Sequence, residues 1–397
     1  MNKRTIRDIE LKGKRALMRV DFNVPISIHS STISDDSRIR ATIPTIKYLR
    51  DQGAMVILCS HMGKPKGKVV EKLKLAPVVK RLSELLGLPV RSTGESIGPE
   101  VEKEVSKLKN GDLLMTENLR FHSEEEENDP EFARALARLG DVYVNDAFGI
   151  AHRAHASTEG ITHYLPAVAG FLLEKELYSL GKTLTNPRHP FATIIGGAKV
   201  SDKIEFLENI QSKVDYLLIG GGMCCTFLKA QGYIINCPIV EENKLDFACG
   251  LMEKATRNGV SLLLPNDLIV SESFANGAPS KAVSIQEIPE NWHVMDIGPQ
   301  TLERFSTELR QCQTILWNGP MGVFELNEFS KGTEGIARLL AEVNATTIVG
   351  GGSTAEVVRE LGLVDKMTHV STGGGASLKF LEGKTLPGVE ALMDKVS

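Results

Sequence analysis

The sequence contains no apolar run of the about 18 residues that a membrane-spanning helix needs. It also lacks an apolar signal core, because the first residues, Met-Asn-Lys-Arg-Thr-Ile-Arg-Asp, continue into charged sequence. Its six cysteines have neither Cys-x-x-Cys spacing nor the density of a disulfide scaffold, which suits a reducing compartment. We therefore expect a cytoplasmic protein with no membrane partner.

An excess of positive charge is also missing. The chain has 46 Lys and Arg against 50 Asp and Glu, a formal net charge of −4. This balance argues against a nucleic-acid partner, so any anion site must be a local pocket of basic residues. With 397 residues, the chain is long enough for two domains, each with its own core.

Two common nucleotide-binding motifs are absent or incomplete. No Gly-x-x-x-x-Gly-Lys-Ser/Thr occurs, which excludes a Walker A P-loop. Residues 350–355 fit a relaxed Gly-x-Gly-x-x-Ala dinucleotide motif, but the next predicted strand ends in Ser371-Thr372-Gly373. The acid that would hold a ribose hydroxyl is missing there, so a nicotinamide oxidoreductase is disfavoured.

Glycine, in contrast, is abundant and clustered. The chain has 36 glycines, and four clusters of them directly follow short apolar runs typical of buried parallel strands. Glycine at a strand end lets the backbone approach a ligand and leaves N–H groups free for phosphate oxygens. Because all four clusters fall within residues 196–375, we predict one ligand site at one sheet edge. The runs 192–195, 216–219, 346–349 and 368–371 precede Gly196-Gly197, Gly220-Gly221-Gly222, Gly350-Gly351-Gly352 and Gly373-Gly374-Gly375.

The first half also alternates predicted strands and helices, so we predict two doubly wound parallel-sheet α/β domains. The predicted strands are 15–24, 54–60, 112–117 and 141–147, and the predicted helices are 38–51, 75–86 and one starting at Asp129-Pro130. A further helix over 164–184 leads into a connector with two prolines, where we place the domain junction. The acidic run 124–127 is interpreted as a solvated loop.

Polar and charged residues crowd the carboxyl ends of the first-half strands. In a parallel sheet these ends share one edge, so the residues should converge into a small basic cup suited to a phosphorylated acid. Lys199 and Lys203 follow Gly196-Gly197, where a strand passes into a helix and phosphate oxygens can be met. The cup residues are Asp21, Asn23, His61, Lys64, Glu117, Asn118, Arg120, Asn145, Asp146, His152, Arg153 and His155.

Eight short motifs follow one another along the chain. They are Arg19-Val20-Asp21-Phe22-Asn23-Val24-Pro25, Ser60-His61-Met62-Gly63, Glu117-Asn118-Leu119-Arg120-Phe121, Asn145-Asp146-Ala147-Phe148-Gly149, His152-Arg153-Ala154-His155, Gly196-Gly197-Ala198-Lys199-Val200, Trp317-Asn318-Gly319-Pro320-Met321-Gly322-Val323-Phe324-Glu325 and Ser371-Thr372-Gly373-Gly374-Gly375-Ala376-Ser377. In residues and order, the chain closely resembles the phosphoglycerate kinase family. The resemblance covers residues 19–384, essentially the whole chain.

The resemblance implies two Rossmann-like domains facing each other across a hinged cleft. Residues 1–170, with 386–397 returning to them, would bind 3-phosphoglycerate or 1,3-bisphosphoglycerate, and residues 171–385 would bind ATP or ADP with Mg²⁺. The implied activity is the reversible phosphoryl transfer of glycolysis, from 1,3-bisphosphoglycerate to ADP, in a monomer.

The resemblance also implies roles for individual residues. Those around the transferring phosphoryl group would be Arg38, Lys199, Gly373, Gly374 and Gly375. Those binding the phosphoglycerate would be Asp21, Phe22, Asn23, Arg38, His61, Met62, Gly63, Lys64, Arg120 and Arg153. Those binding nucleotide would be Gly197, Lys199, Lys203, Gly222, Asn318, Pro320, Glu325, Gly351, Gly352, Ser353 and Thr354.

Two positions depart from the family pattern. Lys64 stands where the family usually has arginine, which replaces a planar fork by a point charge. Ser353 stands where the glycine triplet is usually followed by an aspartate that helps hold Mg²⁺, and a neutral hydroxyl is a poorer ligand, limited to a weak or water-mediated contact. The alternative to the kinase is therefore a catalytically feeble nucleotide-binding relative.

Overall fold

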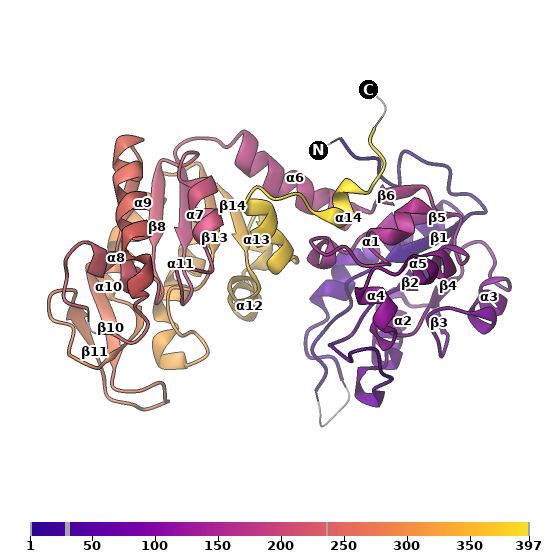
Figure 1. Cartoon of the computed structure of the whole chain (residues 1–397), viewed down its shortest axis with the longest axis horizontal. Helices are drawn as coiled ribbons and strands as arrows, with labels where there is room; N and C mark the ends of the chain where they lie inside the picture. The colour runs from indigo at the N-terminus through magenta and orange to yellow at the C-terminus, as the bar shows by residue number, and fades with distance from the viewer. Residues whose placement is uncertain (1, 28–31, 236, 396–397) are drawn as a thin grey trace. The chain divides into compact units, whose positions relative to one another are not determined.

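The computed structural model describes residues 2–27, 32–235 and 237–395. Its internal contacts group into unit 1, Met1–Tyr178 with Thr385–Ser397, and unit 2, Ser179–Lys384 (Figure 1). Helix α6 (Phe171–Thr185) begins at the predicted boundary of 170/171 and contains the division between the units, after Tyr178. The proline connector after residue 184, where the sequence also placed the junction, lies within unit 2. At the other end, the division lies one residue before the predicted boundary of 385/386.

Unit 1 is built on a parallel sheet, within the described residues, in the order β3-β4-β2-β1-β5-β6. From β1 the chain moves to β2 and outward, then returns to β5 on the other side of β1, which creates a switch point between β1 and β5. The strands are β1 (Arg15–Arg19), β2 (Met55–Cys59), β3 (Arg91–Ser92), β4 (Leu113–Met115), β5 (Val142–Asn145) and β6 (Ala167–Ala169).

The helices of unit 1 follow the predicted apolar stripes and caps. Ile39, Ile46 and Leu49 are buried along α1, and the Asp129 carboxylate accepts a hydrogen bond from the Phe132 N–H at 2.8 Å, capping α5. The α-helices are α1 (Ser37–Asp51), α2 (Ala76–Leu86), α3 (Pro99–Val105), α4 (Ser123–Glu126), α5 (Pro130–Ala137) and α14 (Pro387–Glu390). Short 3₁₀ turns cover Glu71–Leu73, Leu119–Phe121, Phe148–Ile150 and Gly160–His163.

Two sequence predictions in unit 1 are wrong. The helix predicted over 164–184 begins only at Phe171, because Ala167–Ala169 form strand β6 and pair with β5. The acidic run 124–127 is exposed at Glu124, Glu126 and Glu127, as predicted, but it belongs largely to α4 rather than to a loop, and the Glu125 side chain is fully buried. In both cases a partner distant in sequence decides the local structure.

Unit 2 has a second parallel sheet in the order β15-β14-β13-β7-β8-β9 and a small antiparallel sheet in the order β11-β10-β12, which the sequence did not reveal. The strands are β7 (Phe191–Ile195), β8 (Tyr216–Ile219), β9 (Ser261–Leu263), β10 (Asp267–Ser271), β11 (Ser280–Ser284), β12 (His293–Ile297), β13 (Thr314–Asn318), β14 (Thr346–Gly350) and β15 (His369–Val370). The α-helices are α7 (Ile204–Ile210), α8 (Cys224–Ala230), α9 (Leu245–Arg257), α10 (Pro299–Leu309), α11 (Lys331–Glu342), α12 (Gly352–Glu360) and α13 (Gly375–Leu381). The 3₁₀ turns are Glu242–Lys244, Asn327–Phe329 and Val364–Lys366.

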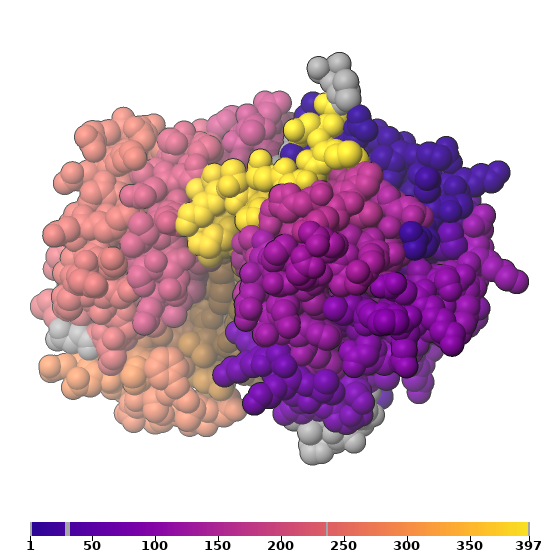
Figure 2. Space-filling view, turned by 45° about the vertical axis from the view of Figure 1, so that its right-hand side comes forward, coloured from indigo at the N-terminus to yellow at the C-terminus, as the bar shows by residue number. Residues whose placement is uncertain are grey.

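The C-terminal segment belongs to unit 1, although unit 2 precedes it in the chain. The Arg4 N–H donates to the Met393 carbonyl at 2.8 Å, and the Met393 N–H donates to the Ala167 carbonyl, in β6, at 3.0 Å. Figure 2 shows this yellow segment beside the indigo start of the chain. The described C-terminal residues, 385–395, therefore pack on unit 1.

Within the described ranges, no helix combines the length and apolar character needed to cross a membrane. All six cysteines are free thiols, and five of them are buried.

Candidate active site

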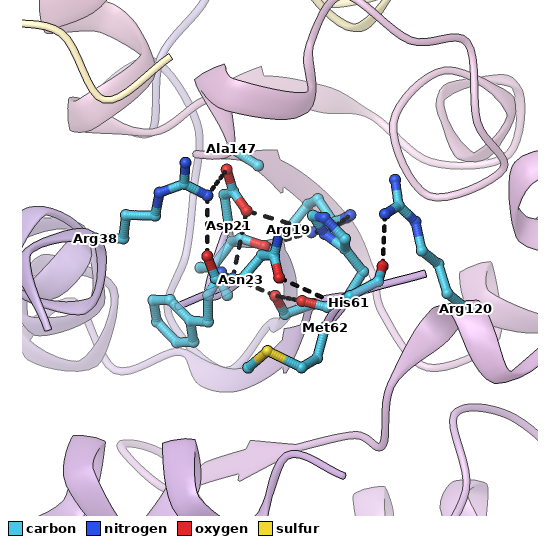
Figure 3. A network of polar contacts seen from close by, with 12 residues as sticks. Arg19, Asp21, Asn23, Arg38, His61, Met62, Arg120 and Ala147 are labelled. Carbon is cyan, nitrogen blue, oxygen red and sulfur yellow. Dashed lines mark hydrogen bonds and ion pairs between the residues drawn. The ribbon is translucent and has the colours of Figure 1, made fainter. Parts of the chain in front are cut away.

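The carboxyl edge of the unit 1 sheet brings five of the predicted substrate residues together (Figure 3). Asp21 and Asn23 follow β1, His61 follows β2, Arg120 follows β4, and Arg38 reaches the same place from the first turn of α1. A parallel sheet produces this convergence because its strands all end at one edge.

Direct contacts fix the geometry of this cluster. Arg38 Nη1 donates to Asp21 Oδ2 at 3.0 Å and to the Asn23 carbonyl at 3.1 Å. Asn23 Oδ1 accepts the Gly63 N–H at 2.9 Å, and Arg120 Nη1 donates to the Gly63 carbonyl at 2.9 Å. Loops from three strands are thus tied into one cationic cup (Figure 3).

His61 is neutral in this cup, and its tautomer follows from its partner. Arg19 Nη2 lies 3.1 Å from His61 Nδ1, and because a guanidinium only donates, Nδ1 must be the acceptor. The remaining ring proton is therefore on Nε2. Burial, and then the positive charges of Arg19 and Arg120, hold the pKa of His61 well below its usual range. His61 can offer a ligand a hydrogen bond without adding charge.

Arg19 and Glu125 form a buried layer beneath the cup that the sequence analysis missed. Arg19 Nε donates to Ser157 Oγ at 2.8 Å, and Ser157 Oγ donates to Glu125 Oε1 at 2.6 Å. Both charged side chains are fully buried. Burial raises the pKa of Glu125, and the nearby charge of Arg19 opposes that rise. The polar Arg19 at the end of an apolar strand was the one signal available in the sequence.

The other predicted substrate residues fall into two groups. Lys64 and Arg153 are exposed, so their charges are accessible to an anion. Phe22 and Met62 are buried, and the Phe22 N–H already donates to Ser60 Oγ at 3.0 Å. The Phe22 carbonyl accepts the Val24 N–H at 2.9 Å, so both backbone groups of Phe22 are used within the fold.

Several polar residues of the predicted cup are used within the fold. Glu117 Oε1 accepts the Leu75 N–H at 3.0 Å, and Asn145 Nδ2 donates to the Gly388 carbonyl at 2.8 Å. Asp146 Oδ1 accepts two N–H groups at the start of α6, and burial raises its pKa to about 7. His155 faces Glu125 at 3.8 Å, and burial and the charge of Arg120 lower the pKa of His155 to about 3.

In unit 2, the four glycine clusters lie where β7, β8, β14 and β15 end, at one edge of one sheet, as the sequence predicts. Strand β13 lies between β7 and β14 and adds Asn318 at the centre of that edge. The Lys203 ammonium donates to Asn318 Oδ1, and burial lowers the pKa of Lys203 to about 8. Asn318 Nδ2 is buried and has no hydrogen-bond partner among the residues that the structure describes.

At part of this edge the backbone is packed too closely for a side chain, whereas an added Cβ at Gly197, Gly352 or Gly374 would meet nothing within 4 Å. A Cβ added at Gly196 would overlap the Pro320 carbonyl, and one at Gly319 would overlap the Gly196 carbonyl. A Cβ at Gly222 would overlap the Ile239 side chain. The Gly197 N–H donates to the Pro320 carbonyl at 3.0 Å, so it is engaged by the protein rather than free for phosphate.

The N–H groups in the first turn of α12 have no partner within the helix. Gly351 has a φ of 88°, which favours glycine, and Gly352 and Ser353 are exposed. Thr354 is buried, and its hydroxyl accepts the Gly319 N–H at 2.8 Å. The unpaired N–H groups and the helix dipole make this end attractive to an anion.

The remaining predicted residues of unit 2 also lie at loops along this edge. Gly373 and Gly374 precede α13 and Gly375 begins it, with the Gly373 N–H donating to Ser371 Oγ at 3.1 Å. Lys199 and Glu325 are exposed. In the described part of the chain, no group of three or more His, Cys, Asp or Glu side chains could hold a metal ion.

Two parallel α/β units, one with a cationic carboxyl edge and the other with a glycine-rich carboxyl edge, define a two-unit α/β phosphotransferase. Residues 6–384 match the family model described as Phosphoglycerate kinase. The chain belongs to the phosphoglycerate kinase family.

Similar proteins agree with this assignment. Proteins named phosphoglycerate kinase from Moorella thermoacetica and Pelotomaculum thermopropionicum are 55% and 54% identical over 395 residues, which cover 100% of each chain. The structure of phosphoglycerate kinase from Coxiella burnetii is 40% identical, with a TM-score of 0.87. That from Pyrococcus horikoshii is 30% identical, with a TM-score of 0.82. Each structure covers 98% of both chains.

Proposed function

We propose that this protein is a glycolytic kinase that transfers a phosphoryl group reversibly from 1,3-bisphosphoglycerate to ADP, giving 3-phosphoglycerate and ATP. The cationic cup of unit 1 is the observation that carries the proposal. Arg38, Arg120 and neutral His61 converge there with Asp21 and Asn23, a combination that suits an anionic, hydroxylated substrate. The feeble alternative receives no support from relatives that share the name phosphoglycerate kinase over their full length.

In unit 1, the phosphoglycerate is bound by charge and by directed hydrogen bonds. Arg120 and the exposed Arg153 and Lys64 supply positive charge for the stable phosphate, and His61 Nε2–H donates a neutral hydrogen bond. The side-chain oxygens of Asp21 and Asn23 would accept from the substrate hydroxyl through their remaining lone pairs. Arg38 reaches toward the phosphoryl group that is transferred.

In unit 2, the nucleotide phosphates are bound by Lys203, by the start of α12 and by the backbone of residues 373–375. A phosphate beside Lys203 raises the pKa of its ammonium back from about 8, so binding favours the charged form. Asn318 Nδ2, buried and without a partner among the described residues, supplies one more donor. Glu325 is an exposed carboxylate and would accept hydrogen bonds from ribose hydroxyls, since phosphate oxygens are themselves acceptors.

The chemistry requires alignment and charge neutralisation rather than a general base. The carboxylate of 3-phosphoglycerate is ionised at neutral pH and attacks as it stands. Arg38 from unit 1, with Lys199 and the backbone of Gly373, Gly374 and Gly375 from unit 2, would surround the moving phosphoryl group, and the Gly373 N–H would exchange its bond to Ser371 Oγ for one to a phosphoryl oxygen. We therefore propose closure about the segment 164–190, so that the two half-sites meet.

Magnesium enters as part of the nucleotide substrate. Ser353 offers only a neutral hydroxyl at a helix start whose dipole repels cations. Mg²⁺ would therefore be held chiefly by nucleotide phosphates and waters, with Ser353 in a weak or water-mediated contact. We also propose a cytoplasmic monomer, a location supported by six free thiols.

A coupled assay that detects 1,3-bisphosphoglycerate formed from MgATP and 3-phosphoglycerate tests this function. We expect turnover. Nucleotide binding without turnover at any Mg²⁺ concentration would replace the kinase with the feeble relative, and failure to bind nucleotide would refute both.

A further inference from the structure

The start of α1 carries Arg38, so the aim of this guanidinium depends on how that turn is held. Asp36 directly precedes α1, but its side chain does not cap the helix. Its Oδ2 instead accepts two hydrogen bonds from Arg81 of α2, from Nε at 2.9 Å and from Nη2 at 2.7 Å. Its Oδ1 accepts from Arg40 Nε at 2.8 Å. The carboxylate thus ties the start of α1 to a second helix.

The Asp36–Arg81 ion pair lies near the surface but is partly buried. The Asp36 side chain is 18% exposed and that of Arg81 is 36% exposed. Burial raises the pKa of Asp36, but the hydrogen bonds from Arg40 and Arg81 outweigh burial and bring the pKa below its ordinary value. Surface ion pairs typically contribute only ~0–1 kcal/mol to stability. Loss of this pair should therefore change the position of the first turn of α1 more than it changes the stability of the protein.

Two other contacts around the start of α1 do not tie it to α2. Ile39 is fully buried and fixes the depth of the first turn against the core. Asp35 Oδ1 accepts the Ser37 N–H at 2.9 Å, a contact within the same stretch. Of these contacts, only the Asp36–Arg81 pair joins the residues before Arg38 to α2.

We propose that Asp36 and Arg81 are positioning residues that hold Arg38 in place against Asp21 and Asn23. The proposal rests on the proposed function, in which Arg38 contacts the transferring phosphoryl group. Loss of the tie should move the guanidinium by a fraction of an ångström, and small misplacements of catalytic groups reduce rates steeply. We expect Arg81→Gln to lower kcat by about three- to tenfold, with little change in KM for ATP.

Arg40→Gln is the matched control. Each variant removes one guanidinium from Asp36, with two hydrogen bonds lost in Arg81→Gln and one in Arg40→Gln. Arg81→Gln also removes the pair with Glu84 within α2. Arg40 lies on α1 itself, so its loss leaves the tie to α2 intact. We expect wild-type kcat for Arg40→Gln and a melting temperature close to wild type for both variants. Equal kcat losses in the two variants would overturn the proposal, as would a loss in Arg81→Gln that tracks a lowered melting temperature.

The same substitution in an Arg38→Ala background tests whether Arg81 acts through Arg38. If it does, adding Arg81→Gln to Arg38→Ala lowers kcat no further. The same fold-loss in both backgrounds would refute the positioning role while leaving the proposed function intact. If Arg38→Ala alone keeps full kcat, the role of Arg38 in the proposed function fails, and this inference fails with it.

Discussion

Removal of the Arg38 guanidinium is the most direct test of the proposed chemistry. Arg38 Nη1 donates to Asp21 Oδ2 at 3.0 Å and to the Asn23 carbonyl at 3.1 Å. Within residues 2–27, 32–235 and 237–395, its Nε and Nη2 groups make no hydrogen bond, and the side chain is 35% exposed. These donors remain available to a phosphoryl group.

The expected size of the effect follows from those free donors. Removing a single donor aimed at developing transition-state charge typically costs about 2.7–4 kcal/mol, or 10²–10³ in kcat. Arg38→Ala should therefore lower kcat by about 10²–10³ while KM for 3-phosphoglycerate changes little. Arg38→Lys keeps the positive charge but loses the planar, forked guanidinium, so its kcat should lie between those of the wild type and of Arg38→Ala.

Steady-state kinetics in the coupled assay, with both substrates varied, measure this split. Circular dichroism and melting temperature serve as controls for folding. If Arg38→Ala raised only KM and left kcat unchanged, Arg38 would be an anchor for bound substrate, and its assignment to the transferring group would be refuted.

Two further predictions concern the metal and pH. Ser353→Asp adds a charged ligand, so it should lower the Mg²⁺ concentration needed for half-maximal activity at fixed ATP; an unchanged or higher midpoint would show that the metal lies elsewhere. Burial raises the pKa of the Asp296 carboxyl, in β12, to about 7. Because the folded state binds this proton more tightly than the unfolded state, proton binding stabilises the fold fully below the unfolded-state pKa of about 3.9. This stabilisation is lost as pH rises through about 7. Asp296→Asn should therefore flatten the fall in unfolding free energy between pH 5 and pH 8, by up to about 3 kcal/mol, in denaturant titrations; parallel wild-type and variant curves would contradict this.

The helices and strands that could be predicted from the sequence are those whose residue pattern is complete within one short stretch. The apolar runs before the glycine clusters correspond to β7, β8, β14 and β15, and the α1 stripe and Asp129 cap have the expected places. Strand β6 was missed because three residues, Ala167–Ala169, carry too short a pattern to stand out from the helix that follows. They form a strand only because β5 is beside them.

The candidate site shows the same limit. The order of the motifs predicted that Asp21, His61 and Arg120 lie at one edge of the sheet, because parallel strands all end on the same side. Sequence order did not reveal that Arg19 lies behind His61, since its Ser157 partner is 138 residues away. Nor did it reveal that the acidic residue beneath the cup is Glu125, because a run of glutamates resembles a solvated surface.

The return of the C-terminal segment has a consequence for the order of synthesis. A ribosome completes the contiguous residues 179–384 before it makes the segment that unit 1 still requires. The hydrogen bond from Asn145 Nδ2 cannot form until the Gly388 carbonyl, 243 residues further on, has been synthesised. The same holds for the hydrogen bond from the Met393 N–H to the Ala167 carbonyl in β6. The unit that is translated first is therefore finished last, and nascent chains stalled before residue 385 would carry a complete second unit beside an unfinished first one.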